Sequence, residues 1–451
     1  MGRPRVVVVG GGASGSLAAL HVLRRYGAEV AVDVVEPRSA LGQGVAFGTQ
    51  DPWHRLNVPS IVMSALPDEP DHFRRWAGVE PTAFPNRMTW GRYLGTVLAE
   101  AGEAPRAELR HRRARATAFE AGSSSPLEVA LDTGEVLAAD ALVIATGNEL
   151  PSLPGPLAGV AGHPRIVVDP WAGDALDVVG DGSVVGILGT GLTALDLSAS
   201  LIRHRPGVRV VAMSRHGQLP RVHEDPWRPK PAQPAFDVEA FRTFADPIAE
   251  AEARIRNYPG GWRQGLDSIR PLHGDLWRAM DEPTRRRFLG ERRRHWEIHR
   301  SRVAAEVIRD VHAWIDDGAL EVRAASLAGV EPVAGGRLRL TTMPAGAGEG
   351  EATLETDWLL VATGPDERAS ASPFLAAGLA AGLLRDGPVG LGIDADPDTL
   401  RVLDADGWPS CPIWALGPVI RGVLFEVIAI PEIRSQASLI ADSIAGGLGG
   451  P

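Results

Sequence analysis

Two amino acids are almost missing from this sequence, and each shortage excludes a group of functions. Cys411 is the single cysteine among 451 residues, so the chain cannot form disulfides, thiolate zinc sites, cysteine-ligated iron–sulfur clusters or a CxxC redox pair. Lys230 is the single lysine and lies in a proline-rich stretch, which argues against Schiff-base or phosphate-binding lysine chemistry. No segment approaches the roughly 20 uncharged apolar residues of a membrane span.

The overall composition narrows the class further. A net charge of −10 argues against a nucleic-acid-binding protein, and a hydrophobic fraction of 44% excludes general disorder. The first ten residues lack the apolar core and cleavage site of a signal peptide. We therefore expect a cytoplasmic protein of two or three domains that binds neither membrane nor nucleic acid, and a homo-oligomer is compatible with this.

A strand, a glycine turn, a helix and a second strand open the chain. Valines at 6–9 form a strand pattern, and Leu17, Leu20 and Leu23 follow at helical spacing. A second strand, 29–35, ends at an acidic residue about 20 residues after the last glycine, where a carboxylate can accept from ribose hydroxyls. This is a dinucleotide-binding pattern, and its predicted cofactor contacts are Gly10, Gly12, Ala13, Ser14, Gly15, Glu36 and Arg38.

A similar unit returns in mid-chain, with a strand at 183–188, a helix at 192–204 and a strand at 208–213. Its second strand does not end in an acid. An arginine there pairs with a 2′-phosphate that a carboxylate would repel, so we expect NADPH at this site, although a plain surface charge remains the alternative. The predicted contacts are Gly189, Thr190, Gly191, Leu192, Thr193, Ser214, Arg215 and His216.

Two hydrophobic strands, 141–145 and 358–362, each end in a Thr-Gly turn, and the pairs Thr146–Gly147 and Thr363–Gly364 are added to the predicted cofactor contacts. The predicted fold class is α/β, with two Rossmann-like dinucleotide-binding domains, for FAD and NADPH, and a helical insertion. The expected boundaries are 1–175 and 358–451 for the FAD domain, 176–220 and 318–357 for the NADPH domain, and 221–317 for the insertion, a substrate lid.

Histidine and arginine clusters in the insertion receive plain structural interpretations. His295 and His299 are four residues apart on a helix, but no third ligand has convincing spacing, so we expect no metal. The arginine-rich stretch 285–294 is interpreted as a solvated helix face. Because both nucleotide cores are already assigned, the insertion is the expected place for substrate, with weak candidates Trp262, Arg263, Asp267 and Arg270.

The chain resembles the two-dinucleotide-binding-domain flavoproteins, and more narrowly an FAD/NAD(P)-binding family whose wider group includes class B flavin monooxygenases that hydroxylate amines. The resemblance rests on the strings at 10–15, 42–47, 54–59, 169–171, 189–196 and 416–418. It implies that further residues lie along the flavin, with Asn57 as the catalytic candidate. These residues are Gly44, Val45, Ala46, Phe47, Asn57, Val58, Met63, Gly417 and Pro418. A turn role for Asn57 and for Gly417–Pro418 is the alternative.

These observations lead to a functional prediction. The cofactors are FAD and NADPH, and without a dithiol the reduced flavin passes its electrons to oxygen or an organic acceptor. We expect a monooxygenase in which flavin forms a C4a-(hydro)peroxide and oxygenates a small amine or amino acid. The chain departs from the Phe-x-Gly-x-x-x-His signature of Baeyer–Villiger enzymes, which argues against their reactions. Alternatives are an NADPH dehydrogenase or oxidase acting on a carbon substrate or a carrier, and a non-catalytic redox sensor.

Overall fold

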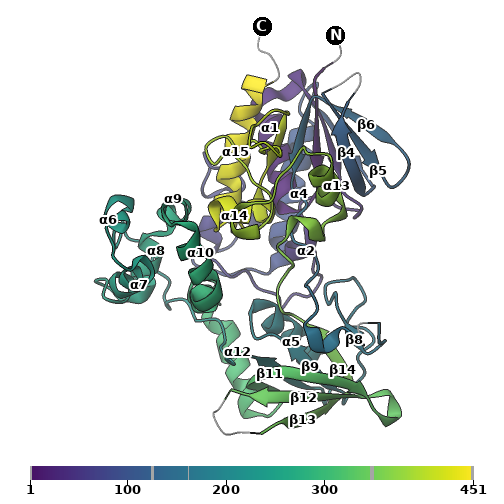
Figure 1. Cartoon of the computed structure of the whole chain (residues 1–451), viewed down its shortest axis with the longest axis vertical. Coiled ribbons are helices and arrows are strands. Elements are labelled where there is room, and N and C mark those ends of the chain that lie inside the picture. Colours follow the sequence, from purple (N-terminus) through teal and green to yellow (C-terminus); the bar gives the residue numbers. More distant parts are fainter. Residues whose placement is uncertain (1–2, 123–125, 161, 346–349, 448–451) are drawn as a thin grey trace.

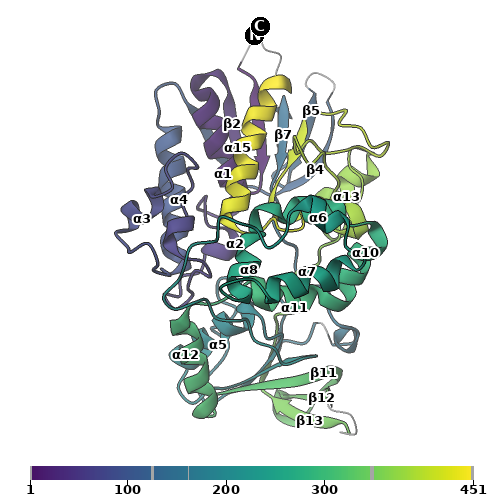
Figure 2. The ribbon, with the colours of Figure 1, turned by 90° about the vertical axis from the view of Figure 1, so that its left-hand side faces the viewer.

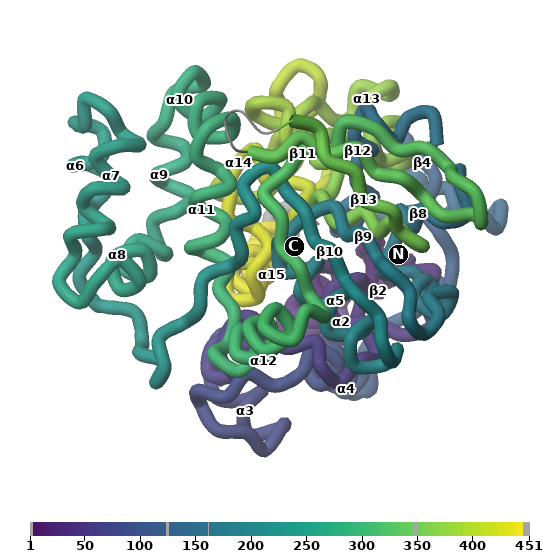
Figure 3. The backbone as a smooth tube through the Cα atoms, turned by 90° about the horizontal axis from the view of Figure 1, so that it is seen from below, coloured from purple at the N-terminus to yellow at the C-terminus, as the bar shows by residue number. Residues whose placement is uncertain are grey.

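The computed structural model describes residues 3–122, 126–160, 162–345 and 350–447. Two sheets occupy opposite ends of the long axis, and a group of helices projects to one side between them (Figures 1 and 3). In the part of the chain described, no helix is both long enough and apolar enough to cross a membrane.

The first sheet has five strands in the order β15-β7-β1-β2-β3, and all neighbouring strands are parallel. Every residue of β2 is buried, as expected for a parallel strand covered on both faces. Valine suits such a strand because its branched side chain packs well on a pleated surface. The strands are β1 (Arg5–Val9), β2 (Ala31–Val35), β3 (Glu108–Arg112), β7 (Ala141–Ile144) and β15 (Ile413–Ala415).

Helices cover one face of this sheet and a small antiparallel sheet covers the other (Figures 1 and 2). The helices are α1 (Ala13–Tyr26), α4 (Arg87–Gly102) and α15 (Ile430–Gly447), with the short α2 (Gly44–Phe47), α3 (His72–Ala77) and α14 (Arg421–Leu424) at their ends. The small sheet comprises β4 (Ala116–Ala121), β5 (Leu127–Leu131) and β6 (Val136–Ala139), and α13 (Pro373–Ala380) packs on β4. One continuous hydrophobic core joins all these layers.

The second sheet has seven strands in the order β13-β12-β11-β10-β9-β14-β8. Five are parallel, and β12 and β13 extend one edge as antiparallel strands. Helices α5 (Leu192–His204) and α12 (Ala305–Asp316) supply side chains to its core. The strands are β8 (Ile166–Val167), β9 (Val184–Leu188), β10 (Arg209–Ser214), β11 (Leu320–Pro332), β12 (Leu338–Pro344), β13 (Ala352–Thr356) and β14 (Trp358–Val361).

The two-core architecture predicted from the sequence is confirmed, but the positions where the chain crosses between cores differ. Strands β8 and β14 both pair within the second sheet. The crossings therefore lie before Ile166 and after Val361, and not at residues 175 and 358. Helix α12, expected in the insertion, packs through Val311 on the second core. Sheet membership is a long-range property, so it cannot be deduced from the similar local sequences of β7 and β14.

Six short helices form the insertion: α6 (Val238–Arg242), α7 (Pro247–Arg256), α8 (Trp262–Ser268), α9 (His273–Ala279), α10 (Glu282–Arg287) and α11 (Arg293–Arg300). Aspartates at 237, 246 and 281 accept from the first backbone amides of α6, α7 and α10, which explains where these helices begin. Ion pairs anchor the insertion to the first core, including Arg270 with Glu432 at 2.6 Å. It is therefore a docked subdomain.

The first glycine turn provides a stability test. A Cβ at Gly15 would lie 1.8 Å from the carbonyl oxygen of Gly10, and this backbone atom cannot move without displacing α1. Overpacking costs about 1–3 kcal/mol, more than the roughly 1 kcal/mol that alanine gains in a helix. We therefore expect Gly15→Ala to lower the free energy of unfolding in urea. Gly155→Ala, with no atom within 4 Å of its Cβ position, should change it by less than about 0.5 kcal/mol. Equal effects would contradict the argument.

Candidate functional site

The first candidate nucleotide site is the turn between β1 and α1. Gly10 has a φ of +102°, and a Cβ there would lie 2.3 Å from the carbonyl oxygen of Ala145. Gly12 is the N-cap of α1 and has no side chain to satisfy the first helical amides, and the first turn carries no acidic residue. These amides and the positive end of the helix dipole are therefore available to an anion, as a bound pyrophosphate requires.

Three distant segments close around this turn. A Cβ at Gly44, where φ is +55°, would lie 2.9 Å from the Cα of Gly12. A Cβ at Gly417 would lie 2.5 Å from the Oγ of Ser14. The Oγ1 of Thr146 is buried and has no hydrogen-bond partner among the described residues. The predicted contacts from 10–15, 44, 146 and 417 thus lie together, and the missing side chains and the unpaired hydroxyl fit a dinucleotide cofactor such as FAD.

Glu36 supports the turn itself. Its Oε2 accepts from the backbone amide of Gly11 at 2.9 Å, and its Oε1 accepts from the amide of Arg38 at 3.0 Å. Glu36 is 4% exposed, and its carboxylate stabilises the glycine loop independently of any contact with a ribose. A carboxylate has about four lone-pair positions, so the predicted ribose contact stays compatible with these bonds.

The residues expected along the flavin divide into accessible and buried ones. Val45 and Ala46 are exposed beside Gly44, whereas Phe47 packs on Trp90 with ring centroids 4.2 Å apart. Val58 is 8% exposed and belongs to the core. Met63 is 1% exposed, and its carbonyl accepts from the Trp90 indole at 2.7 Å. Met63 is thus a core residue, and its contact with a cofactor stays a prediction.

Asn57 is half-buried, and its carbonyl accepts from the Nε2 of His223 at 2.9 Å. Burial and the nearby Arg302 lower the pKa of His223 to about 4, so the imidazole is neutral at pH 7. The loop before the insertion therefore holds the segment that carries the catalytic candidate. His223 was not predicted as a functional residue, because an isolated histidine in a proline-rich loop carries no sequence pattern.

The second candidate nucleotide site is the turn between β9 and α5. Gly189 has a φ of +124°, and a Cβ there would lie 2.2 Å from the Ala362 carbonyl, next to the predicted Thr363–Gly364 pair. Gly191 is the N-cap of α5 and again provides no capping side chain, so Leu192 and Thr193 begin the helix with free amides. The Oγ1 of Thr190 lies 2.8 Å from the Oγ of Ser214, at the end of β10. These predicted residues lie together.

The charges around this second turn match an anionic nucleotide. Arg215 and His216 are exposed just after β10, the strand position where a 2′-phosphate is expected. Arg294 of the insertion also reaches the turn, where its Nη2 donates to the Gln218 carbonyl at 2.5 Å and to Thr190 Oγ1 at 3.2 Å. Sequence analysis interpreted this arginine as part of a solvated helix face, and that interpretation is wrong because Arg294 is half-buried.

The weak substrate candidates do not form one pocket. Trp262 lines a cavity within the insertion, whereas Arg263 lines a separate polar cavity beside His223. Arg270 is paired with Glu432 through two hydrogen bonds of 2.6 and 2.9 Å, and Asp267 is paired with Arg302. With their charges already neutralised, Arg270 and Asp267 are not free to anchor a zwitterion. Substrate contacts by Trp262 and Arg263 stay predictions.

Metal binding was not expected, and among the described residues no cluster of three or more metal-ligating side chains occurs. His295 and His299 contact each other, with ring centroids 4.3 Å apart. The Nδ1 of His299 donates to the His295 carbonyl at 2.7 Å, which is a contact within α11.

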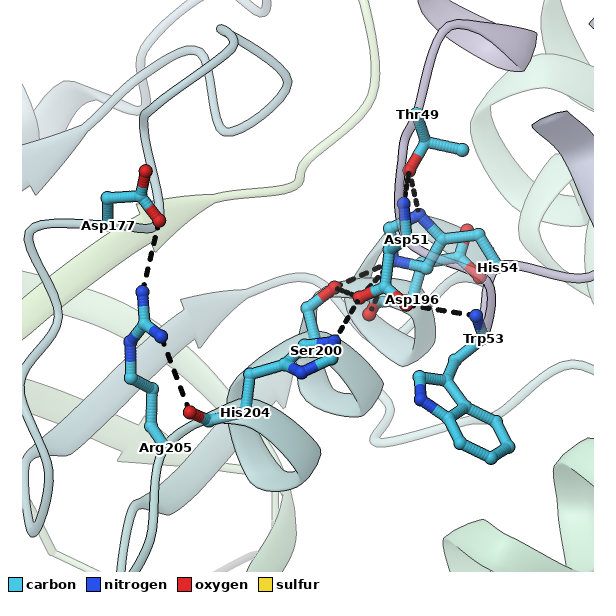
Figure 4. A network of polar contacts seen from close by, with 9 residues as sticks. All are labelled: Thr49, Asp51, Trp53, His54, Asp177, Asp196, Ser200, His204 and Arg205. Atoms are coloured by element: carbon cyan, nitrogen blue, oxygen red, sulfur yellow. Dashed lines mark hydrogen bonds and ion pairs between the residues drawn. The ribbon is translucent and has the colours of Figure 1, made fainter.

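A buried polar network joins the two nucleotide cores (Figure 4). Ser200 of α5 donates to Asp51 of the first core, so its oxygen is free to accept from the Nε2 of His54 at 2.9 Å. The Nδ1 of His54 lies 2.7 Å from the Thr49 hydroxyl, which orients the imidazole ring. Beside the network, Asp196 of α5 pairs with Arg87 of α4 at 2.7 Å. The Nε2 of His54 also lies 3.1 Å from the Asp196 carbonyl oxygen, so two strings behind the family resemblance, at 54–59 and 189–196, contact each other.

Residues 7–149 match the FAD-NAD(P)-binding family. This range contains the first glycine turn, Glu36, Asn57 and the Thr146–Gly147 pair. The structure has the α/β fold of two-dinucleotide-domain flavoproteins. No curated protein is a match for the whole sequence or a part of it.

Solved structures share the fold over nearly the whole chain. The ornithine hydroxylase of Pseudomonas aeruginosa is 16% identical with a TM-score of 0.69, covering 99% of this chain and 100% of its own. The ornithine N-hydroxylase of Kutzneria sp. 744 is 19% identical with a TM-score of 0.66, covering 99% of each chain. A bacillithiol disulfide reductase of Staphylococcus aureus is 14% identical with a TM-score of 0.59 and covers 99% of each chain.

The ion pair between the cores provides a second test. The side chains of Arg87 and Asp196 are 15% and 12% exposed, so Arg87→Met leaves a buried carboxylate without its counter-charge. Removing one partner of such a pair costs about 3–5 kcal/mol, whereas replacing both by apolar residues is close to neutral. We expect Arg87→Met to destabilise the protein strongly in urea unfolding, and Arg87→Met/Asp196→Leu to recover most of the loss.

An exposed ion pair serves as the control for replacing an arginine by methionine. Arg286 and Glu282 are 60% and 63% exposed, so Arg286→Met should change the unfolding free energy by less than about 1 kcal/mol. If Arg286→Met and Arg87→Met had the same effect, or if the double variant were no more stable than Arg87→Met, the ion pair would not hold the cores together.

Proposed function

We propose that the chain is an NADPH-dependent FAD monooxygenase that oxygenates a small nucleophile, with N-hydroxylation of an amine or amino acid as the favoured reaction. The observation that carries the proposal is the pair of glycine turns, each at an uncapped helix start between parallel strands, in two cores held together by buried polar contacts. Bound FAD supplies electron transfer from NADPH and oxygen transfer to the substrate.

The first turn is the proposed FAD site. Gly12 and Gly44 let their two loops approach each other closely beside the amides of α1, which would bind a pyrophosphate, and Thr146 provides an unpaired hydroxyl among the described residues. Gly417–Pro418 lies against Ser14 on the opposite side. His223 fixes the backbone at Asn57 through one hydrogen bond, and the Asn57 side chain would donate to a flavin ring bound at this site.

The second turn is the proposed NADPH site. Arg215 and His216 would pair with the 2′-phosphate, and Arg294 adds a positive charge beside the glycine turn. No carboxylate ends β10, and this favours NADPH over NADH.

The choice of electron acceptor rests on the single cysteine. The folds of hydroxylases and of disulfide reductases both match the chain, but one cysteine cannot form a dithiol within it. Cys411 is half-buried, and burial raises the pKa of its thiol, which makes it a poor nucleophile. Oxygen and an organic substrate are therefore the favoured acceptors.

The decisive experiment uses the purified protein loaded with FAD. NADPH oxidation and oxygen consumption are measured with a panel of amines and amino acids, and products are analysed for the gain of one oxygen atom. Coupled formation of a hydroxylated amine supports the proposal. Stoichiometric hydrogen peroxide with every compound would instead indicate an oxidase. A purified protein that does not retain FAD would contradict both enzymatic functions and favour a sensor.

The 2′-phosphate contact predicts a change in cofactor preference. Arg215→Ala removes a charge-assisted hydrogen bond to the phosphate, and we expect the KM for NADPH to rise about tenfold, which is about 1.4 kcal/mol. The KM for NADH, which lacks this phosphate, should not change. Arg209→Ala is the matched control because Arg209 starts the same strand and is paired with Glu321. An unchanged KM for NADPH in Arg215→Ala would overturn the assignment.

A further inference from the structure

The helical insertion encloses a cavity of about 270 Å³ that is separate from both glycine turns. An apolar cavity of roughly 150 Å³ can hold a benzene molecule, so this one has room for two fused rings. Its walls are mainly apolar and aromatic, with rings supplied by Phe236, Phe241, Trp277, Phe288, Trp296 and Phe425. Close-packed protein interiors rarely leave such a space, so its size and lining require an explanation.

Two tryptophan N–H groups of this wall are already paired. Trp277 donates to the Gly422 carbonyl at 2.7 Å, and Trp296 donates to Glu426 at 2.7 Å. Trp277 also stacks on Phe425 with centroids 4.6 Å apart. These contacts join the cavity wall to the segment 422–426 of the first core, so its shape is set by fixed rings.

His273 is the exception in this wall. It lines the cavity, is 6% exposed, and neither of its ring nitrogens has a hydrogen-bond partner among the described residues. Burial lowers its pKa to about 4, although Glu426 opposes the shift, so the ring is neutral and offers one donor and one acceptor. A buried polar group without a partner costs about 1–3 kcal/mol, which a ligand that bonds to it would recover.

The cavity has a polar, accessible side. Arg256 and His295 line it and are exposed to solvent, which marks the route by which a small molecule can enter. The opposite side, at Trp277 and Phe288, is buried. A flat molecule entering here would insert its apolar rings between the aromatic walls and lie against His273, whose buried ring nitrogens must turn toward the cavity to bond it.

We infer that this cavity binds a flat aromatic molecule of one or two rings that carries one N–H or O–H group, which bonds to His273. The site goes beyond the proposed oxygenation, since it depends on neither glycine turn. Its specificity comes from two parts: the aromatic walls select a planar apolar body, and the unpaired imidazole selects a molecule with one hydrogen-bonding group.

The test compares indole with indene, its hydrocarbon counterpart without the N–H, by isothermal titration calorimetry on the full-length FAD-loaded protein. We expect indole to bind about tenfold more tightly than indene. His273→Phe keeps a ring of similar size and removes an unpaired polar group, so the variant should fold. It should bind indole about tenfold more weakly and indene unchanged.

Two further variants test the location. Ala251 of α7 lines the cavity, so Ala251→Phe should fill it and abolish binding of both compounds. Ala249 is exposed on the same helix and does not line the cavity, so Ala249→Phe should leave binding unchanged. The proposal is overturned if indole does not bind, if indole and indene bind the unmodified protein equally, or if Ala251→Phe binds as well as Ala249→Phe. The readout requires no NADPH oxidation, so it stands or falls separately from the monooxygenase proposal.

Discussion

The arrangement of the whole molecule depends on the buried polar contacts between α5 and the first core. A nucleotide bound at one glycine turn can react with a cofactor at the other only if the two sheets keep a fixed relation. His54, Ser200 and Asp51 provide directional bonds, and Arg87 with Asp196 provides charge. Burial raises the pKa of Asp196, and the neighbouring Arg87 guanidinium opposes this shift.

The same constraint explains why the helical insertion is held on both cores. Arg293 and Arg421 both pair with Glu367, which fastens α11 to the first core. One residue further along, Arg294 reaches the second glycine turn. A single helix thus touches the segment around Glu367 and the proposed NADPH site. This geometry joins the insertion to both cores, and the role of substrate lid expected from the sequence stays a prediction.

The elements visible in the sequence are those whose signals are local. Valines of β1 and the apolar spacing of α1 identified the first core, and the bounds expected for α5, 192–204, agree with the structure. Strand membership of β14 could not be deduced, because its sequence resembles that of β7 and pairing depends on distant partners. The contact of Arg294 with the second glycine turn could not be predicted for a related reason. A run of arginines has the same composition whether its side chains are exposed to solvent or contact a buried turn.

His273 shows a deeper limit of sequence patterns. The spacing of aromatic residues in α6 to α11 indicates where side chains point, but not whether their volumes fill the space between the helices. A void is a difference between two large volumes, and no motif encodes it. The unpaired, neutral His273 also lowers the stability of the folded chain, because an apolar residue of the same shape would avoid the cost of burying an imidazole without hydrogen bonds. A protein tolerates this cost most readily where a bound ligand removes it. The proposed specificity of the insertion therefore lies in its cavity, whereas its charged residues join the insertion to the two cores.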